Sequence, residues 1–167
     1  MTRKYIHFFS HVTHVSLELP VMWEEAVETE RSVIYTLSLE DLPEYEGHAI
    51  PSVNRPQDPI FAIQLIALKN PEAGELANIA DAFLHQKRER ISVINRDTQL
   101  VDGYDAIVIT FNSDNQGQSG RNYELQSFII IDDVLFSISA VAPEFMQPVF
   151  AKDFDNALRS IRFIFFD

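Results

Sequence analysis

Apolar and polar residues alternate with a period of two in several stretches of the chain, which is the pattern of half-buried β-strands. The clearest pair of stretches covers 92–101 and 104–111, on either side of Asp102 and Gly103. An Asp-Gly pair in this position favours a tight hairpin, because glycine tolerates the positive φ of a type I′ turn. The pattern therefore predicts an antiparallel hairpin here.

A second pair of strand-like stretches follows at 122–131 and 134–141. Asp132 and Asp133 separate them, and two adjacent aspartates between strands are typical of a turn. Acid–base catalysis by two carboxylates would instead require a cleft that separates their pKa values. We therefore interpret these two residues as the turn of a second hairpin.

Three further strands are predicted upstream. Residues 15–19 alternate strictly and end at Pro20, which has no amide hydrogen to offer a sheet. β-Branched and other strand-forming residues dominate 32–39. Residues 60–68 are almost continuously apolar, which predicts a central strand buried on both faces.

Two helices are predicted. The first begins after the central strand, with Asn70 as its N-cap and Pro71 in its first turn. Its apolar residues recur at helical spacing and form one stripe: Leu76, Ile79, Ala80 and Phe83. The second lies near the C-terminus, where Pro143 and Pro148 divide it into two pieces. The apolar run 160–166 then predicts a final strand.

Together these patterns predict an α+β fold in which helices pack on an antiparallel sheet of about six to seven strands. The chain has 167 residues, which fits a single domain over 1–167, with residues 1–13 expected to be held more loosely. An apolar fraction of 46% with thirteen Phe indicates a packed core rather than a disordered chain.

Charge and composition exclude several classes of function. The formal net charge is −12, so the surface would repel a phosphate backbone, and we expect no nucleic-acid partner. There is no cysteine, which excludes disulfides and thiolate chemistry. No apolar run reaches the ~20 residues of a membrane span, and no signal peptide is evident at the start. We therefore expect a soluble, cytoplasmic protein.

The sequence contains few candidates for a chemical site. His7, His11 and His14 could share one face of a helix and bind a metal, but their β-branched neighbours favour an extended chain that separates them. The carboxylates that begin at Glu40 and Asp41 lack the alternating ligands of a calcium loop. No phosphate-binding glycine motif and no nucleophile elbow occurs. We therefore predict no catalytic, cofactor or metal residues.

The sequence favours a surface for contact with a partner over a chemical site. The stretch 42–59 contains four prolines and one glycine, and irregular stretches of this length are often functional. Its candidate contact residues are Tyr45, His48 and Arg55. Trp23 is a fourth candidate, because tryptophan often dominates interface energy. Packing of Trp23 against the edge of the core is the alternative interpretation.

The chain resembles the PsbP-like family. The resemblance rests on Leu-Pro-x-x-Trp at 19–23, a central apolar strand followed by a helix, a meander, and a closing helix with Ser-Ile-Arg-Phe at 160–163. That family includes PsbP of photosystem II, Mog-type Ran-binding proteins, and DcrB-like and Eag-type chaperones. The resemblance implies an α/β/α sandwich around an antiparallel sheet, and members that bind proteins without catalysis.

The expected function is therefore a non-enzymatic protein-interaction or assembly module, with binding at 42–59 and on the open face of the sheet. An exposed apolar groove would favour an Eag-type chaperone that shields apolar partner helices, whereas a flat acidic face would favour a docking module. A pocket between helix and sheet with convergent polar groups would favour a small-ligand-binding protein or an enzyme. Strands at the edge of the sheet could also pair across a two-fold axis and form a homo-oligomer.

Overall fold

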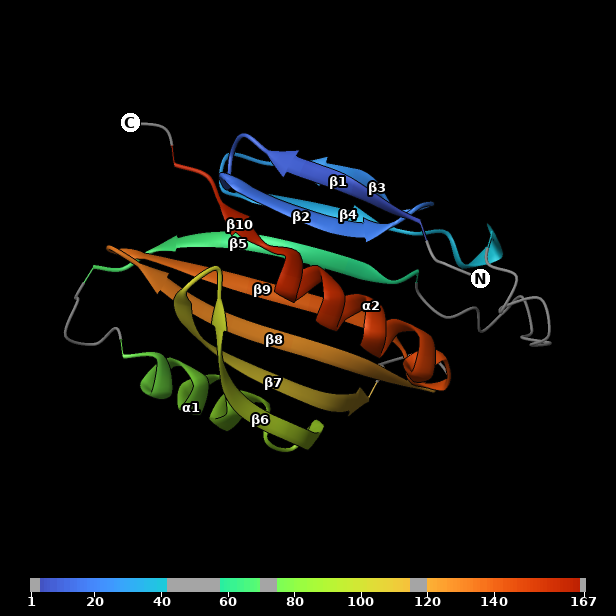
Figure 1. The fold of residues 1–167 in the computed structure, drawn as a ribbon. Helices are drawn as coiled ribbons and strands as arrows, with labels where there is room; N and C mark the ends of the chain where they lie inside the picture. The colour runs from blue at the N-terminus through green and yellow to red at the C-terminus, as the bar shows by residue number, and fades with distance from the viewer. Residues whose placement is uncertain (1–3, 42–57, 70–74, 115–119, 166–167) are drawn as a thin grey trace.

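The computed structural model describes residues 4–41, 58–69, 75–114 and 120–165. They form two antiparallel sheets (Figure 1). The larger has seven strands in the order β3-β4-β5-β9-β8-β7-β6, and the smaller has three in the order β1-β2-β10. The strands are β1 (Tyr5–Ser10), β2 (Val15–Pro20), β3 (Glu24–Glu28), β4 (Ser32–Thr36), β5 (Ile60–Ala67), β6 (Ile91–Val101), β7 (Tyr104–Asp114), β8 (Arg121–Ile131), β9 (Val134–Pro143) and β10 (Arg162–Phe163).

Both predicted hairpins are confirmed. Strands β6 and β7 pair around Asp102 and Gly103, whose φ angles of 49° and 83° are the two positive values that a type I′ turn requires. Strands β8 and β9 pair around Asp132, which also has a positive φ, 53°. Aspartate tolerates this conformation better than most residues, so turn chemistry fixes both registers locally.

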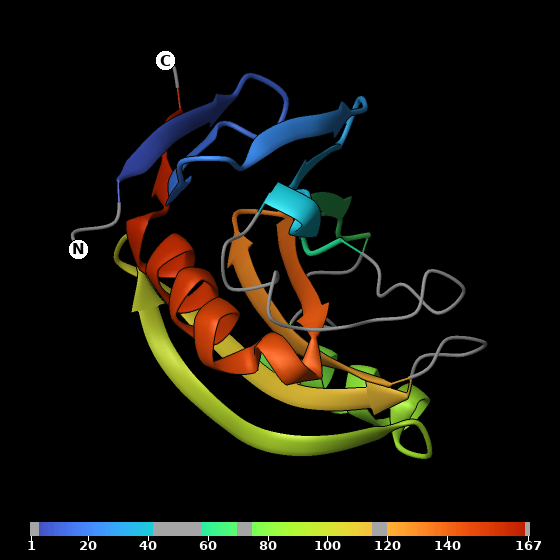
Figure 2. The same ribbon diagram turned by 90° about the vertical axis from the view of Figure 1, so that its right-hand side faces the viewer.

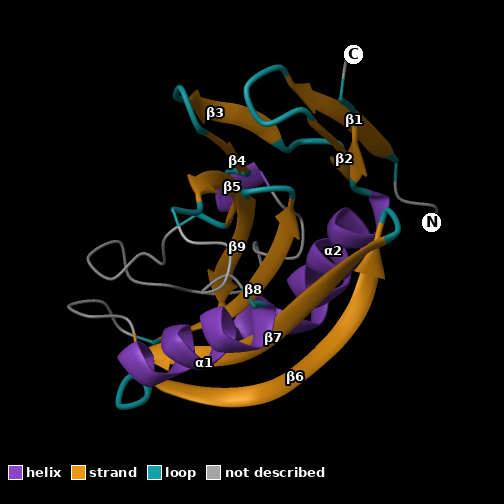
Figure 3. Ribbon diagram, turned by 90° about the vertical axis from the view of Figure 1, so that its left-hand side faces the viewer, coloured by secondary structure: helices purple, strands orange, loops and turns teal. Residues whose placement is uncertain are grey.

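The concave face of the larger sheet holds the main core. Figures 2 and 3 show the sheet curling around α2 (Gln147–Ser160), and the smaller sheet extends the cover on the same side. Phe150 and Phe154 of α2 are fully buried and stack at 6.0 Å between ring centroids. The predicted division of this helix is confirmed, since a short 3₁₀ turn, η5 (Glu144–Met146), precedes it.

The other face carries α1 (Leu76–Lys87), which packs on β7 and β8. Its predicted apolar stripe is confirmed: Ala80 is fully buried, and Phe83 lies 5.8 Å from Phe111 and 5.5 Å from Phe128 between ring centroids. The described helix begins at Leu76, whereas the predicted N-cap at Asn70 lies outside the described residues. With α2 on one face and α1 on the other, the α/β/α sandwich and the α+β class are confirmed.

Strand β5 is central, as predicted, but its burial on both faces was wrong. Phe61 and Ile63 are fully buried on the concave face, whereas Gln64 and Ile66 are exposed on the other. The reason is that α1 lies over β7 and β8 rather than over β5. The almost continuous apolar run therefore belongs to a strand with one buried and one accessible face.

Two smaller differences lie at the chain ends. Residues 5–10 form β1, paired with β2 along its full length, a strand that the sequence analysis did not assign. The predicted final strand at 160–166 is reduced to β10, which pairs with β2 through two residues. Its Phe163 packs edge-on against Tyr104 at 5.4 Å and Phe136 at 5.0 Å between ring centroids.

Candidate partner-binding surface

Six apolar side chains line up on the face of the larger sheet that carries α1, beyond the part that α1 covers. They come from four neighbouring strands, β3, β4, β5 and β9. The strand registers place Val27, Ile34 and Ala62 in one row and Ile60 beside Val141. Ile66 lies farther along β5, beside Leu135 of β9, and Gln64 separates it from Ala62 on this face. Val27 and Ile66 are 48% and 40% exposed, and the other four are half-buried. We call this surface the open face: Val27, Ile34, Ile60, Ala62, Ile66 and Val141.

A hydrogen-bonded row separates the open face from the region under α1. Gln126 of β8 is 5% exposed, and its Nε2 donates to the Oγ of Ser137 at 2.9 Å. The Oγ of Ser139 donates to the Gln126 Oε1 at 2.6 Å. Because the amide is satisfied within the sheet, its burial leaves no unpaired polar group.

The rim of the open face at the edge strand β3 is acidic. A bulge between Glu25 and Val27 shifts the register, so that Glu25 and Glu28 both point to the concave side while Glu24 points to the open face. A hydrogen bond to Glu28, aided by burial and by the negative charge of Glu28, raises the pKa of Glu25. Charged residues and a bulge on an edge strand also discourage pairing with other sheets.

The concave side holds a polar groove between α2 and strands β6 to β8. Its volume is about 210 Å³, and Asp97, Tyr123 and Asp155 are among the residues that line it. Arg159 pairs with Asp155 at 3.0 Å. Burial, followed by the charge of Asp155, raises the pKa of the Tyr123 phenol. A phenol with a raised pKa stays protonated at neutral pH.

The sequence-predicted contact residues do not gather at one place in the described structure. Trp23 is 3% exposed and packs edge-on against Phe150 at 6.3 Å and Phe154 at 6.4 Å between ring centroids. The indole packs against α2, which is the geometry that the alternative interpretation, packing against the edge of the core, expects. Tyr45, His48 and Arg55 lie outside the described residues.

The three N-terminal histidines lie in different settings. His7 projects from β1, where its Nε2 lies 2.8 Å from the Oε1 of Glu18 on β2. His11 packs edge-on against Phe9 at 4.8 Å, and His14 lies 6.4 Å from Phe165, both between ring centroids. Across the described ranges, no group of three or more His, Asp or Glu side chains is placed to hold a metal ion. The described helices also include none that is long and apolar enough to cross a membrane.

No family model matches the chain, and no curated protein sequence matches it. Solved structures do. The Ran-binding protein Mog1p of Saccharomyces cerevisiae matches with a TM-score of 0.66 at 10% identity, over 98% of this chain and 97% of that one. Cyanobacterial PsbP from Synechocystis matches with a TM-score of 0.62 at 10% identity, over 98% and 94%.

The chain has the PsbP-like fold. A third match, LpqN of Mycobacterium tuberculosis, which is described as involved in cell envelope biogenesis, agrees with it at a TM-score of 0.64 and 10% identity, over 96% of this chain and 91% of that one. At these identities the likeness to PsbP-like structures shows the fold alone. The open face was not predicted residue by residue, because its six residues become neighbours only through pairing of distant strands.

Proposed function

We propose that this chain is a non-enzymatic protein-interaction module, which docks a protein partner on the open face. The observation that carries the proposal is the presence of six accessible or half-buried apolar side chains on one face of four neighbouring strands, beside an acidic rim. Apolar side chains gathered in this way, bordered by charged residues, are typical of protein interaction sites. The Ran-binding activity of Mog1p adds support from a protein of the same fold.

The area of the open face determines how far beyond it a partner must make contacts. Four strands at a spacing of ~4.8 Å, and six steps of ~3.3 Å from Ile60 to Ile66, give an area of about 400 Å². A stable interface buries about 800 Å² on each side. The open face therefore supplies about half of an interface, and a partner has to extend over its rim to bind stably.

The alternatives have less support. A chaperone that shields apolar helices on a concave sheet would need that side free, whereas here α2 and the smaller sheet occupy it. A small-ligand-binding protein or an enzyme would use the groove beneath α2, but Asp155 there is held by Arg159 and Tyr123 has a raised pKa. An accessible apolar face with an acidic rim fits docking better than either.

The test is capture of protein partners on the immobilised full chain, compared between the wild type and Ile66→Asp. Leu100→Asp is the matched control, because Leu100 is also an exposed apolar residue of this sheet, 68% exposed on β6. We expect Ile66→Asp to reduce the recovery of a specific partner at least tenfold, since a carboxylate would be desolvated in the interface. Leu100→Asp should leave recovery unchanged.

Two results would overturn the proposal. Equal recovery of the same partner by the wild type and by both variants would place binding elsewhere on the molecule. Retention of a small molecule in place of any protein would favour the ligand-binding alternative.

A further inference from the structure

Strand β6 forms one edge of the larger sheet, and among the described strands only β7 pairs with it. It spans eleven residues, and most of its side chains are exposed, on both faces of the sheet. A long, exposed edge strand presents a row of unpaired backbone groups to which another strand can be added. Strand β6 is therefore a candidate site for pairing with another chain.

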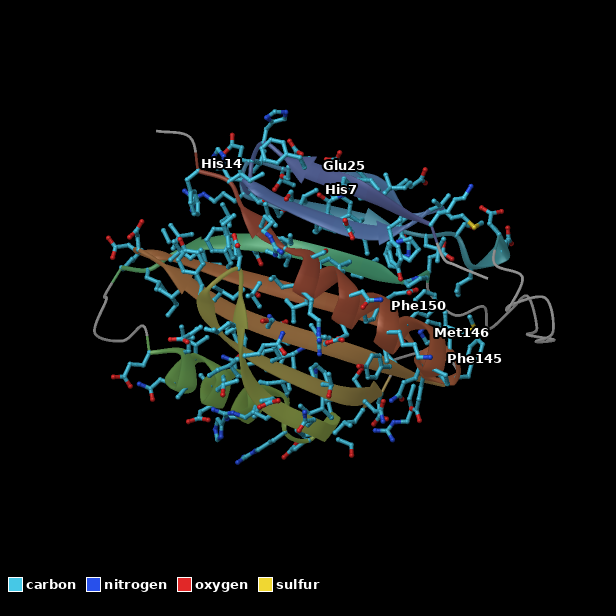
Figure 4. All side chains as sticks on the ribbon, viewed as in Figure 1. His7, His14, Glu25, Phe145, Met146 and Phe150 are labelled. Atoms are coloured by element: carbon cyan, nitrogen blue, oxygen red, sulfur yellow. The ribbon has the colours of Figure 1, made fainter. Side chains whose placement is uncertain are left out.

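The two edges of the sheet differ in how well they suit such pairing. At the other edge, where Figure 4 shows Glu25, β3 has five residues with a central bulge and three exposed glutamates. In β6 the bulge lies before Asn95 and leaves 95–101 regular. The charge of Arg96 is paired on α1, with 2.6 Å between its Nη1 and the Oδ1 of Asp81. The stretch 95–101 is therefore better suited to pairing than β3.

Backbone groups at three positions of β6 point away from the sheet. The two residues next to the tight turn form a hydrogen-bonded pair, and such pairs alternate along an antiparallel ladder. The N–H and C=O groups of Arg96, Thr98 and Leu100 therefore face outward. In agreement, the Thr98 N–H donates to the Oδ1 of the adjacent Asp97 at 2.8 Å. Another strand can exchange hydrogen bonds with these three residues.

The side chains along this stretch divide between the two faces of the sheet. One set lies on the face that carries α1, and the other lines the polar groove beside α2. The first set is Arg96, Thr98 and Leu100, and the second is Asn95, Asp97 and Gln99. Leu100 is 68% exposed, the highest value among the described large apolar side chains.

A second copy of the chain can pair with β6 about a two-fold axis perpendicular to the sheet. Opposite residues share a face, and this axis keeps each side chain on its own face, so it passes through a residue of the strand. An axis at Arg96 or Asp97 would place like charges opposite each other, which is destabilising. An axis at Asn95 would extend the pairing into the bulge. An axis at Thr98 avoids these contacts and pairs 95–101 of each copy in full.

In this register the opposing side chains complement each other. Thr98 lies opposite Thr98 of the second copy, and Thr–Thr pairs stabilise antiparallel strands. Arg96 lies opposite Leu100, so its aliphatic stem covers the exposed leucine while its guanidinium group stays on α1. Asp97 lies opposite Gln99, whose amide can donate to the carboxylate. The outward backbone groups add about six hydrogen bonds between the copies.

We propose that the chain forms a homodimer in which two β6 strands pair antiparallel about a two-fold axis at Thr98. The two seven-stranded sheets then form one continuous sheet. The dimer goes beyond the proposed function, because the open face lies on β3, β4, β5 and β9, toward the other edge. Seven paired residues extend over only about 23 Å, so we expect less than the ~800 Å² per side of a standard interface and a dimer that dissociates at micromolar concentrations.

The first test is sedimentation equilibrium of the full chain from about 1 μM to 1 mM, where weak interfaces dissociate. We expect a monomer–dimer equilibrium in the wild type. Leu100→Arg should weaken the dimer about tenfold, because it places two positive charges opposite each other. Thr98→Pro should weaken it similarly, because it removes an outward N–H at the axis, and proline is tolerated on an edge strand. Ile66→Asp is the matched control and should dimerise like the wild type.

The second test uses the absence of cysteine from the chain. The Cα atoms of a hydrogen-bonded antiparallel pair are about 5.5 Å apart, which is within the range of a disulfide. Thr98→Cys should therefore form a covalent dimer on mild oxidation. Arg96→Cys is the control, because its two copies would be four residues out of register, about 13 Å along the strands, and should stay uncrosslinked.

Three results would overturn the inference: a wild type that stays monomeric at about 1 mM, dimerisation of folded Leu100→Arg as strong as that of the wild type, or equal crosslinking of the two cysteine variants. Leu100→Arg keeps the first test decisive if Thr98→Pro fails to fold, because it changes an exposed side chain. Loss of the dimer in Leu100→Arg with partner recovery unchanged would support two separate surfaces. A monomeric wild type that still loses its partner in Ile66→Asp would leave the docking function standing and remove the dimer.

Discussion

Replacement of Trp23 by alanine tests whether the sole tryptophan belongs to the core or to a contact surface. Trp23 is 3% exposed, and large aromatic side chains bury about 150–250 Å². At ~25 cal/mol per Å², that area corresponds to about 4–6 kcal/mol, which is an upper bound because the unfolded chain already hides part of it. Measured Phe and Trp to Ala substitutions in cores cost about 3–5 kcal/mol. We therefore expect Trp23→Ala to lower the free energy of unfolding by about 4 kcal/mol.

This loss is large relative to the total. Domains of this size have stabilities of about 5–15 kcal/mol. With an unfolding entropy of ~2.1 cal/mol/K per residue, 4 kcal/mol corresponds to a fall in melting temperature of about 11 °C. Trp23→Phe keeps an aromatic ring beside Phe150 and Phe154, so we expect a loss of only about 1–2 kcal/mol.

The assay is thermal and urea unfolding followed by circular dichroism, which does not depend on the indole. Acrylamide quenching of the wild-type fluorescence gives an independent measure, because the emission comes from one tryptophan. A loss below about 1 kcal/mol in Trp23→Ala, together with quenching as efficient as that of free indole, would refute the core assignment. Trp23 would then return to the candidate contact residues.

Two further predictions concern the β3 edge and the first hairpin. Because the pKa of Glu25 is raised above its ordinary value of 4.5, the folded state binds more protons than the unfolded state in that range, so stability falls as the pH rises through it. Melting curves should therefore show Glu25→Gln to be more stable than the wild type at pH 7, with the difference shrinking below pH 4.5; an equal difference at both pH values would contradict this. Gly103 has a φ of +83° and nothing within 4 Å of an added Cβ, so Gly103→Ala should cost only backbone strain, about 1 kcal/mol or ~3 °C in melting temperature. Gly103→Asn should cost less, and an equal or greater loss in the asparagine variant would show that the turn does not need the left-handed conformation.

The sequence predicts well those elements that a short stretch of residues determines. Asp102 and Gly103 determine the turn of a hairpin, and the apolar stripe on α1 identifies the face that the helix buries. In both cases the chemistry and the structure that it produces lie within one short stretch of chain. No distant partner has to be known for the prediction to succeed.

The surface features are different because they depend on distant partners. Whether Ile66 is buried depends on where α1 lies, and the run 60–68 contains no signal for that position. Glu25 and Glu28 point to the same side of the sheet because of a bulge in a five-residue strand, and no residue pattern in 24–28 predicts that bulge. Trp23 carried a signal for burial, its place just after a strand, but the same residue type is also typical of interfaces.

The accessible part of the second face follows from the number and size of the covering elements. Seven strands at ~4.8 Å spacing span about 29 Å between the outermost axes, whereas one helix is about 10 Å across and covers about two strands. The concave face has α2 and a three-stranded sheet to cover it, but of the described elements the second face has α1, which contacts β7 and β8. Strands β3, β4 and β5 therefore retain an accessible face whatever the details of packing. Stability alone does not require apolar residues there, and under the proposed function Val27 and Ile66, at 48% and 40% exposure, are the side chains that the partner would cover.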